Sequence, residues 1–431
     1  MSDPDSDSRP ARFVWLPPGL RPPVVMPARA ERVILLVGAA AFFAGYDQNV
    51  YGLAIPQIQA SLHIPENQIG LTVTWFRLAA LVALLIAASA DLIGRRRLLL
   101  VTLFGQGLFT LATAFAPDYV SFVWAQGLTR VFGYAEEMLC FVVIAEEVAA
   151  AARGWSNGTL TALYYLGAGI ASLMFSLVTL LPYGWRSLYG IGSLAIFLVA
   201  FLRRRLPETE RFASVEKVRG AVSKFAQTTA LLRDLARQYP ARVLTVVIAA
   251  GAFGFAISPA TVLQSKYLQS FYHYQPWQIT LLTIPSGLVA LALAIMAGRL
   301  SDRLGRKPVA FTIVALAGIC FYFFYNSGGA PGWAVPLLWL GSFFGFFSGD
   351  ALIAGFALEI VPTAYRATVS GLRYVVEIML GALALALEGR LYDHFHAHGP
   401  AIQAMLAAIP ITLVAILFLP EPAGKSLEEM A

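Results

Sequence analysis

Eight ionisable side chains stand inside stretches of the chain that are otherwise almost entirely apolar. They are Asp47, Arg77, Arg130, Glu136, Glu137, Asp350, Arg373 and Glu377. A charged group in such surroundings is costly unless it pairs with another charge, binds a ligand or carries a proton. These residues are therefore the first candidates for proton transfer and for binding a charged solute.

Two pairs among them have a spacing that indicates contact. Arg373 and Glu377 are one helical turn apart and share a helix face. Asp47 and Arg77 fall at similar depths in two successive apolar stretches, which predicts a second ion pair. An acid beside an arginine can release its proton when paired and regain it when the pair separates, so we rank Asp47 first and Glu377 second for proton coupling. The alternative for each pair is a fixed ion pair that holds helices together.

A pattern of Asp, Gly and Arg occurs twice, at residues 89–97 and 300–308, and 211 positions separate Asp91 from Asp302. Two further echoes keep an offset of 213 positions, Arg153 with Arg366 and Pro207 with Pro420. Three echoes at nearly one offset indicate a duplicated half-chain.

Glu137 and Asp350 are also 213 positions apart. A carboxylate kept at corresponding positions of both halves is hard to explain by packing, so both are predicted to take part in proton coupling. For the neighbouring Glu136, the alternative is a side chain that points into a water-filled cleft and has no role.

The composition of the chain fits a lipid bilayer. Of its 431 residues, 58% are hydrophobic and only 13% are charged. Twelve stretches are long enough to cross a bilayer as helices, at about 33–55, 69–90, 98–116, 119–149, 157–181, 185–203, 243–270, 276–299, 308–327, 333–361, 366–392 and 400–420. We therefore predict an all-α membrane protein with twelve transmembrane helices in two pseudo-symmetric six-helix bundles. Parallel repeats in an apolar chain are typical of secondary transporters.

The predicted organisation has five parts. They are a disordered cytoplasmic tail at 1–31, a six-helix bundle at 32–203, a cytoplasmic linker at 204–241, a second bundle at 242–420 and a cytoplasmic tail at 421–431.

Most of the 31 lysines and arginines fall in the tails and in the connections that follow even-numbered stretches. Cytoplasmic loops carry this excess, so both termini are predicted to be cytoplasmic in a multi-pass protein of the cytoplasmic membrane. The net charge of +6 then reflects topology and anionic lipid rather than nucleic acid. We expect protons, a small molecule and the lipid bilayer as partners, no nucleic acid and a monomer.

The repeated loop pattern resembles the signature of the major facilitator superfamily. Residues 298–307 match Gly-x-x-x-Asp-x-x-Gly-Arg-Lys at every defining position, and the first copy departs once, with Ala87 in place of glycine. Pro362-Thr-x-x-Arg366 and the Pro-Glu pairs after stretches six and twelve resemble the branch with sugar porters, organic-ion carriers and aromatic-acid:proton symporters. The resemblance covers about residues 33–426 and implies transport by alternating access, with no cofactor.

The loop pattern also has a physical interpretation. An aspartate beside a helix N-terminus is favoured by the helix dipole, and the following arginine can reach a carboxylate at another helix end. The resemblance implies that such latches join the two halves on the cytoplasmic side and break during transport. The predicted latch residues are Asp91, Gly94, Arg95, Glu146, Arg153, Asp302, Gly305, Arg306, Glu359 and Arg366. The alternative is a plain positive loop.

For substrate binding, the resemblance implies charged and aromatic side chains on the pore-lining stretches. They are Arg77, Arg130, Arg373, Tyr46, Trp75, Tyr164, Phe346 and Tyr374. The sugar-porter signature of the seventh stretch and the Gly-Pro motif of drug exporters in the fifth stretch are missing. Aromatic-acid symporters carry Asp-Gly-Tyr/Phe-Asp in the first stretch, and this chain keeps only the second acid, Asp47, with Ala44 at the position of the first.

Three histidines alternate after the eleventh stretch. His394, His396 and His398 follow Asp393 in a geometry that zinc can use, but no fourth ligand is evident and the alternative is polar surface. We predict no metal site there.

The sequence therefore predicts a proton-coupled transporter that carries an organic acid, aromatic in one version of the hypothesis, into a bacterium. The surplus of carboxylates over arginines keeps an organic cation or drug carrier as the alternative, with a sugar carrier third. A receptor of the same fold would move no solute. An enzyme is not expected, because no nucleophile–base or metal-ligand grouping is visible.

Overall fold

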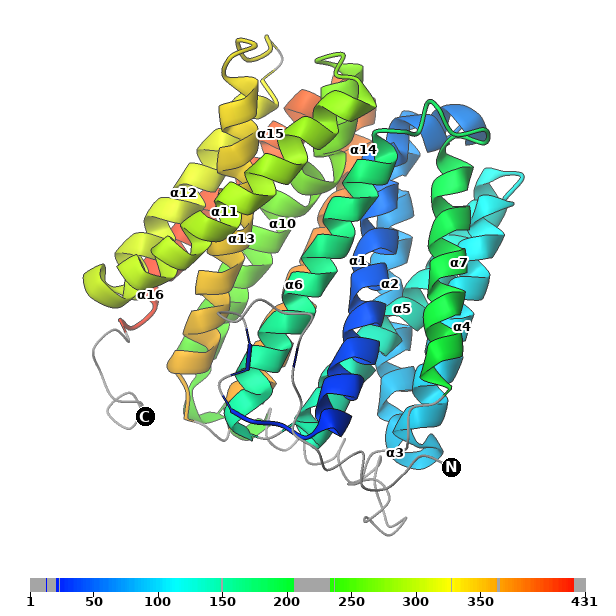
Figure 1. Cartoon of the computed structure of the whole chain (residues 1–431). Helices are drawn as coiled ribbons and strands as arrows, with labels where there is room; N and C mark the ends of the chain where they lie inside the picture. The colour runs from blue at the N-terminus through cyan, green and yellow to red at the C-terminus, as the bar shows by residue number, and fades with distance from the viewer. Residues whose placement is uncertain are drawn as a thin grey trace. The chain divides into compact units, whose positions relative to one another are not determined.

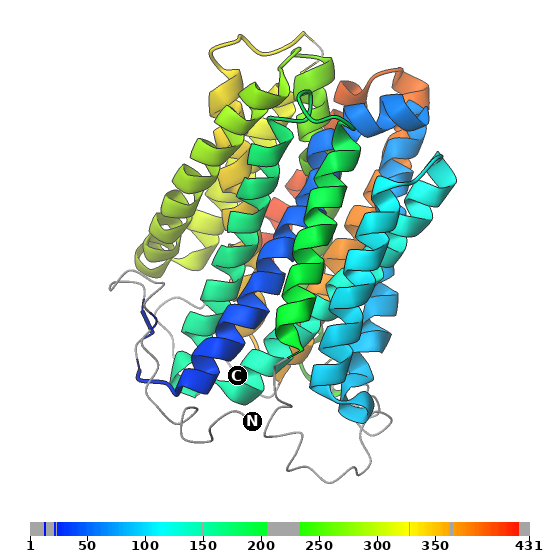
Figure 2. The same ribbon diagram turned by 45° about the vertical axis from the view of Figure 1, so that its right-hand side comes forward.

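The protein is described by a computed structural model that covers residues 13, 21–22, 24–148, 150–204, 233–235, 237–326, 328–362 and 365–421. The long regular elements of these residues are all helices, drawn in chain order in Figure 1 and turned by 45° in Figure 2. The chain divides into two compact units. Unit one holds residues 1–62 and 79–223, and unit two holds residues 63–78 and 224–431.

Unit one is built from long helices that pack side by side. Its helices are α1 (Ala28–Leu62), the second half of α2 (Ile69–Ala88), the short α3 (Ala90–Ile93), α4 (Arg95–Ala114), α5 (Tyr119–Glu147), α6 (Ala150–Phe175) and α7 (Trp185–Arg203). The most extensive packing joins α1 to α6, and α4 to both α5 and α7.

Unit two repeats this arrangement. It contains η3 (Glu66–Gln68), the first half of α2, α10 (Pro240–Ser270), α11 (Pro276–Leu304), α12 (Arg306–Phe324), α13 (Val335–Glu359), α14 (Arg366–Phe395), α15 (His398–Leu406) and α16 (Ile409–Phe418). Here α10 packs along α14, and α12 along α13, which are the counterparts of the α1–α6 and α4–α5 pairs. The duplicated sequence therefore folds into two units with the same helix pairing.

Eleven helical segments of the described chain are long and apolar enough to cross a membrane. The long helix missing from this set is α5, whose apolar face is interrupted by Arg130, Glu136 and Glu137. The segment at 398–418 counts once, although α15 ends at Leu406 and α16 begins at Ile409. Pro410 stands in the first turn of α16 and lacks the N–H that would continue the preceding helix. The all-α membrane fold is confirmed.

The first helix is longer than predicted. It begins at Ala28 and runs through Pro56 to Leu62, whereas the predicted stretch ended at 55. A proline interrupts one backbone hydrogen bond, but packed neighbours allow the helix to continue. Pro259 and Pro285 likewise stand inside α10 and α11.

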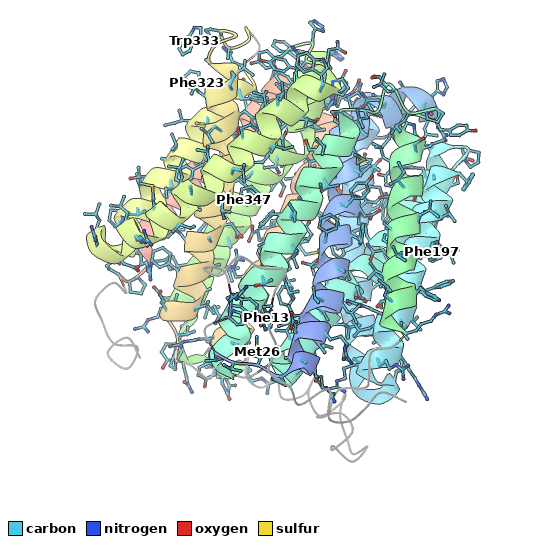
Figure 3. All side chains as sticks on the ribbon, viewed as in Figure 1. Phe13, Met26, Phe197, Phe323, Trp333 and Phe347 are labelled. Carbon is cyan, nitrogen blue, oxygen red and sulfur yellow. The ribbon has the colours of Figure 1, made fainter. Side chains whose placement is uncertain are left out.

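Two residues of the predicted disordered tail are packed instead. Phe13 and Met26 are buried in a core cluster of unit one, and the Phe13 ring meets Trp155 edge-on at 5.4 Å between centroids. Figure 3 labels both residues near the start of α1. Burial of these two large apolar side chains favours their packing against unit one. Most of the predicted linker at 204–241 and of the tail at 421–431 lies outside the described residues.

Candidate functional site

Asp47 lies at the centre of the charged cluster in unit one. It stands on α1, its side chain is 1% exposed, and its Oδ1 accepts a hydrogen bond from Thr110 of α4 at 3.1 Å. Its Oδ2 has no hydrogen-bond partner and lies 3.9 Å from Nη1 of Arg130 on α5. The predicted partner of Asp47 was Arg77, so the pairing differs from the prediction. The pair forms because α1 packs against both α5 and the helices beside it.

Arg130 is also buried and is held by the backbone of α1. Its Nη2 donates to the carbonyl oxygens of Asp47 and Gln48, at 3.4 and 3.3 Å. The arginine therefore contacts two successive carbonyl groups of α1 while its Nη1 faces the Asp47 carboxylate. An ion pair at 3.9 Å with one unbonded carboxylate oxygen is looser than a charge-assisted hydrogen bond, for which about 2.7–2.9 Å is usual.

The two tyrosines predicted to contact substrate in unit one have different surroundings. Tyr46 is buried, and its hydroxyl donates to the carbonyl oxygen of Leu188 on α7 at 2.9 Å. Its ring packs so close to Gly192 that a Cβ there would lie 2.7 Å from it, which makes Tyr46 a packing residue. Tyr164 is only partly buried, and its hydroxyl donates to Oε1 of Gln48 at 3.0 Å. Glu137 also lies close to Gln48.

Glu136 is not a side chain in a water-filled cleft. It is buried on α5 and forms an ion pair with Arg203 at the end of α7, and both side chains are essentially inaccessible. Thr102 donates to the same carboxylate at 2.5 Å, and Arg203 also donates to the carbonyl oxygen of Leu36 at 3.1 Å. The sequence analysis did not single out Arg203, so it missed this pair. Its position inside the last turn of an apolar stretch was the only available signal.

The charged cluster of unit two is centred on Arg373. Its Nη1 lies 2.5 Å from Oε2 of Glu377 on the same helix and 2.7 Å from Oδ1 of Asp350 on α13. The structure thus contains the predicted i, i+4 contact and adds Asp350 to it. Glu377 is mostly buried, whereas Asp350 is 39% exposed. Two carboxylates therefore share one guanidinium nitrogen, and they carry one more negative charge than it balances.

Arg77 belongs to unit two and lies beside this cluster. Its Nη1 donates to the hydroxyl of Ser258 on α10 at 2.8 Å, and it is close enough to Glu377 to interact electrostatically. This contact needs glycine at position 381, because a Cβ there would lie 2.3 Å from both the Arg77 nitrogen and the Ser258 oxygen. Of the predicted aromatic contacts, Trp75 and Tyr374 are half exposed, and Phe346 is partly buried against the neighbouring phenylalanine.

The repeated loop has the same backbone in both units. Gly94 has φ 99° and ψ 142°, and Gly305 has φ 102° and ψ 149°, each just before a helix. Side chains avoid this region, so glycine is required at both positions. The shared geometry is structural support for the duplication.

The second copy of the loop forms a network around Arg306. Its guanidinium contacts Glu359 at 2.9 and 3.1 Å and Asp302 at 2.8 Å, and the backbone N–H groups of Arg306 and Lys307 donate to Glu421. All these residues belong to unit two. The predicted contact of Arg306 with the carboxylate of Glu359 is present. These contacts hold α11, α12, α13 and Glu421 together within unit two.

The first copy is described less completely. The side chains of Asp91, Glu146 and Arg153 lie outside the described residues. Arg95 donates to the carbonyl oxygen of Ala90 at 3.2 Å. Glu147, next to the predicted Glu146, pairs with Arg29 of α1 at 3.0 Å, a contact that the sequence did not suggest. In the second half, Nε and Nη2 of Arg366 have no hydrogen-bond partner among the described residues.

Of the alternating histidines, His394 and His396 are exposed and His398 is turned inward. Its Nδ1 lies 2.6 Å from Oε1 of Glu388, and its Nε2 lies 2.9 Å from Oε2 of Glu66. In the described part of the chain no group of three or more His, Cys, Asp or Glu side chains is arranged to hold a metal ion.

Known transporters are similar to this chain over most of its length. A citrate-proton symporter of Salmonella typhi is 26% identical over 77% of this chain and 80% of its own. The 3-(3-hydroxy-phenyl)propionate transporter of Escherichia coli is 27% identical over 67% of this chain and 70% of its own. The crystal structure of a D-xylose-proton symporter superposes with a TM-score of 0.72 over 92% of this chain and 99% of its own, at 17% identity, which shows the shared fold alone.

The family model described as Major Facilitator Superfamily matches residues 37–384 and, a second time, 247–429. These matches cover most of the chain and include Asp47, Arg130, the Arg373 cluster and both copies of the loop. The chain therefore belongs to the Major Facilitator Superfamily of membrane transporters.

Proposed function

We propose that this transporter carries a small organic acid, aromatic in the favoured case, across the cytoplasmic membrane together with protons. The similarity to a citrate-proton symporter and to a transporter of a phenylpropionate supports this substrate class. Both printed substrates are organic acids, and one is aromatic. The distribution of Lys and Arg supports cytoplasmic termini.

The observation that carries the proton-coupling proposal is the loose and buried Asp47–Arg130 pair. Asp47 is 1% exposed, its Oδ2 has no hydrogen bond, and Arg130 is 3.9 Å away. A buried carboxylate with one oxygen that lacks a hydrogen bond is stabilised by protonation or by a closer cation. Asp47 therefore has the two states that a coupling residue needs: protonated and separate from Arg130, or ionised and paired with it.

Asp47→Asn tests this step, because asparagine has nearly the same shape and does not titrate. In proteoliposomes with an imposed pH gradient, we expect the variant to lose accumulation of substrate against its gradient. Exchange of labelled for unlabelled substrate should persist, because exchange needs no net proton movement. Continued accumulation in Asp47→Asn would show that coupling lies elsewhere, with Glu377 next in rank and Glu137 and Asp350 after it.

Asp118→Asn is the matched control. Asp118 is the exposed N-cap of α5, where its side chain accepts from the backbone of Ser121, and asparagine is an equally good N-cap. The control changes the same atoms in the same unit without touching the buried pair. It should keep both accumulation and exchange.

The substrate class is tested with Arg373. An anion brought into an apolar region needs a positive partner, since an unpaired buried charge costs several kcal/mol. Arg373→Gln should weaken binding of an organic acid that stabilises the purified protein in a thermal-shift screen. Unchanged affinity in this variant would exclude Arg373 as the cationic partner of the substrate.

One observation favours an organic cation as the second candidate. Asp350 and Glu377 share Arg373, and Asp350 is 39% exposed, so this cluster presents an accessible carboxylate. A cationic ligand would lose affinity in Asp350→Asn, whereas an organic acid would not.

A further inference from the structure

Four charged side chains, three of them largely buried, form a cluster at the end of unit two where residues 63–78 lie. They are Glu66 of η3, Lys266 of α10, Glu388 of α14 and His398 of α15, and we call them the His398 cluster. Glu388 is fully buried, and the side chains of Lys266 and His398 are nearly so. None of these residues takes part in the proposed coupling step at Asp47.

The geometry of the cluster fixes how many protons it holds. Both ring nitrogens of His398 face carboxylate oxygens, Nδ1 at 2.6 Å from Glu388 and Nε2 at 2.9 Å from Glu66. A neutral imidazole has a single N–H, so it can satisfy only one of these contacts. The other contact would then set a ring lone pair against a carboxylate oxygen. The observed arrangement therefore requires one additional proton, on the ring or between the ring and Glu388.

The charge balance agrees with this proton count. With His398 protonated, two cations face two carboxylates, and Lys266 lies 2.7 Å from the Glu66 oxygen that His398 also contacts. Without the proton, the fully buried Glu388 loses its cationic partner, and its Oε2 already lacks a hydrogen bond. An unpaired buried carboxylate is strongly unfavourable.

Other titratable groups around the ring do not change this balance. They are Tyr392 of α14, whose ring lies 4.5 Å from that of His398, Asp393 of α14, which accepts from Asn67 at 3.1 Å, Tyr267 of α10 and Tyr325 at the end of α12. The tyrosines are neutral over the physiological range. Asp393 is engaged by the amide of Asn67.

The His398 cluster holds a segment that is otherwise joined by close backbone packing. A Cβ on Gly70 would lie 2.1 Å from the carbonyl oxygen of Leu385, and one on Gly389 would lie 2.0 Å from that of Asn67. Thr74 donates to the carbonyl oxygen of Ala382 at 2.8 Å. Residues 63–78 thus pack with their backbone directly against α14. Few long side chains bridge the two, so little contact would remain if the segment moved away from the helix.

We propose that the His398 cluster is a second proton-binding site, which fastens residues 63–78 to α10, α14 and α15 when protonated and releases them when the proton leaves. The segment continues in sequence into helices of unit one at both ends, so its attachment matters to more than one helix. Because successive spans alternate in direction, the cluster is on the face opposite the Asp302–Arg306 loop, which the charge distribution predicts to be the outer face. The site responds to the pH on that face.

The direction of the pH effect on the segment follows from the number of protons that the cluster holds. Low pH keeps the extra proton in place and the segment attached, and high pH removes the proton and loosens the segment. The His398 cluster shares no residue with the proposed coupling and substrate sites, so its test needs no transport assay and no ligand. If the His398 proposal fails, the proposed function stands, and if the proposed function fails, the His398 proposal stands.

The experiment measures the reaction of a maleimide with a thiol at Ile64, a buried residue of the segment. Cys140 and Cys320 are replaced by alanine, so Ile64→Cys carries the only thiol of the full-length protein, which is held in lipid nanodiscs. Because thiol reactivity itself depends on pH, each rate is divided by that of an exposed cysteine at His63 measured at the same pH. The normalised rate should rise with pH when His398 is present.

His398→Gln removes the extra proton at every pH. We expect the normalised rate at pH 6 to be at least about tenfold above that of the His398 protein, since a charge-assisted hydrogen bond is lost. At pH 9 the two rates should converge. His394→Gln is the matched control, an exposed histidine in the last turn of α14, and it should keep the rising profile. Equal normalised rates for His398→Gln and the His398 protein at pH 6 would overturn the proposal.

Glu66→Gln covers the case in which His398→Gln does not fold. In this variant Glu388 can accept a hydrogen bond from Nδ1 of a neutral His398, and the amide introduced at position 66 can donate to Nε2. The second proton is no longer required, so the normalised rate should depend less on pH. Folding of each variant is checked by size-exclusion profile and thermal unfolding. A folded Glu66→Gln protein that keeps the full pH response would also refute the second proton site.

Discussion

The two units share a backbone plan but handle their buried charges differently. In unit one, Glu136 is enclosed with Arg203, and Asp47 faces Arg130, so that each of these two carboxylates has its own arginine. In unit two, Asp350 and Glu377 share Arg373, and Asp350 is accessible to water.

The difference separates ion pairs that affect mainly the stability of the fold from carboxylates that can bind a proton or a ligand. Removal of one partner from a fully enclosed ion pair lowers stability far more than removal of both partners, because it leaves an uncompensated buried charge. A cluster with an accessible carboxylate can take up a proton or a ligand at little structural cost. Equivalent positions in a duplicated fold therefore need not have equivalent roles, as Glu137 and Asp350 illustrate: only Asp350 has an ion pair in the described structure.

The largest expected effect is at the enclosed pair of unit one. Arg203→Ala leaves Glu136 buried without a cation and should lower the free energy of unfolding by about 3–5 kcal/mol. Chemical unfolding of the purified protein in detergent measures this loss. The double variant Arg203→Met/Glu136→Met should recover most of it, because no unpaired charge remains. An unfolding midpoint for Arg203→Ala equal to that of the unmodified protein would contradict the view that this pair is structural.

An intermediate effect is expected where the units are alike. Gly94→Ala and Gly305→Ala each force a side chain into the same strained backbone region and should each cost about 1–3 kcal/mol. Similar losses of unfolding free energy in the two variants would show that the two copies of the loop are alike in energy as well as in geometry. Gly158→Ala, at a helical position with open space around it, is the control and should not destabilise the protein. A loss at only one of the two loop glycines would show that the copies are energetically different.

The smallest effect on stability is expected at the exposed carboxylate of unit two. Asp350→Asn keeps Arg373 paired with Glu377 and should change the free energy of unfolding by less than about 1 kcal/mol, as for other accessible ion pairs. The same unfolding assay measures it. A loss comparable with that of Arg203→Ala would remove the distinction between the two clusters.

The sequence by itself determined the features that depend on local or periodic information. Twelve apolar stretches, the offset of 211–213 positions and the matched loop predicted an all-α duplicated membrane fold, because span length and repetition are visible without contacts. The Arg373–Glu377 contact was predictable for the same reason, since one helical turn separates the two residues.

Only the tertiary structure decided which distant charges meet. Asp47 was matched to Arg77 on depth, yet its partner is Arg130, and neither the Arg203–Glu136 pair nor the His398–Glu388 contact was predicted. Depth along a helix follows from residue number, but the direction of a side chain depends on how each helix is rotated against its neighbours. Those rotations are set by contacts such as Gly381 beside Arg77 and Gly70 against Leu385, where a missing side chain lets two helices touch, and sequence spacing does not encode them.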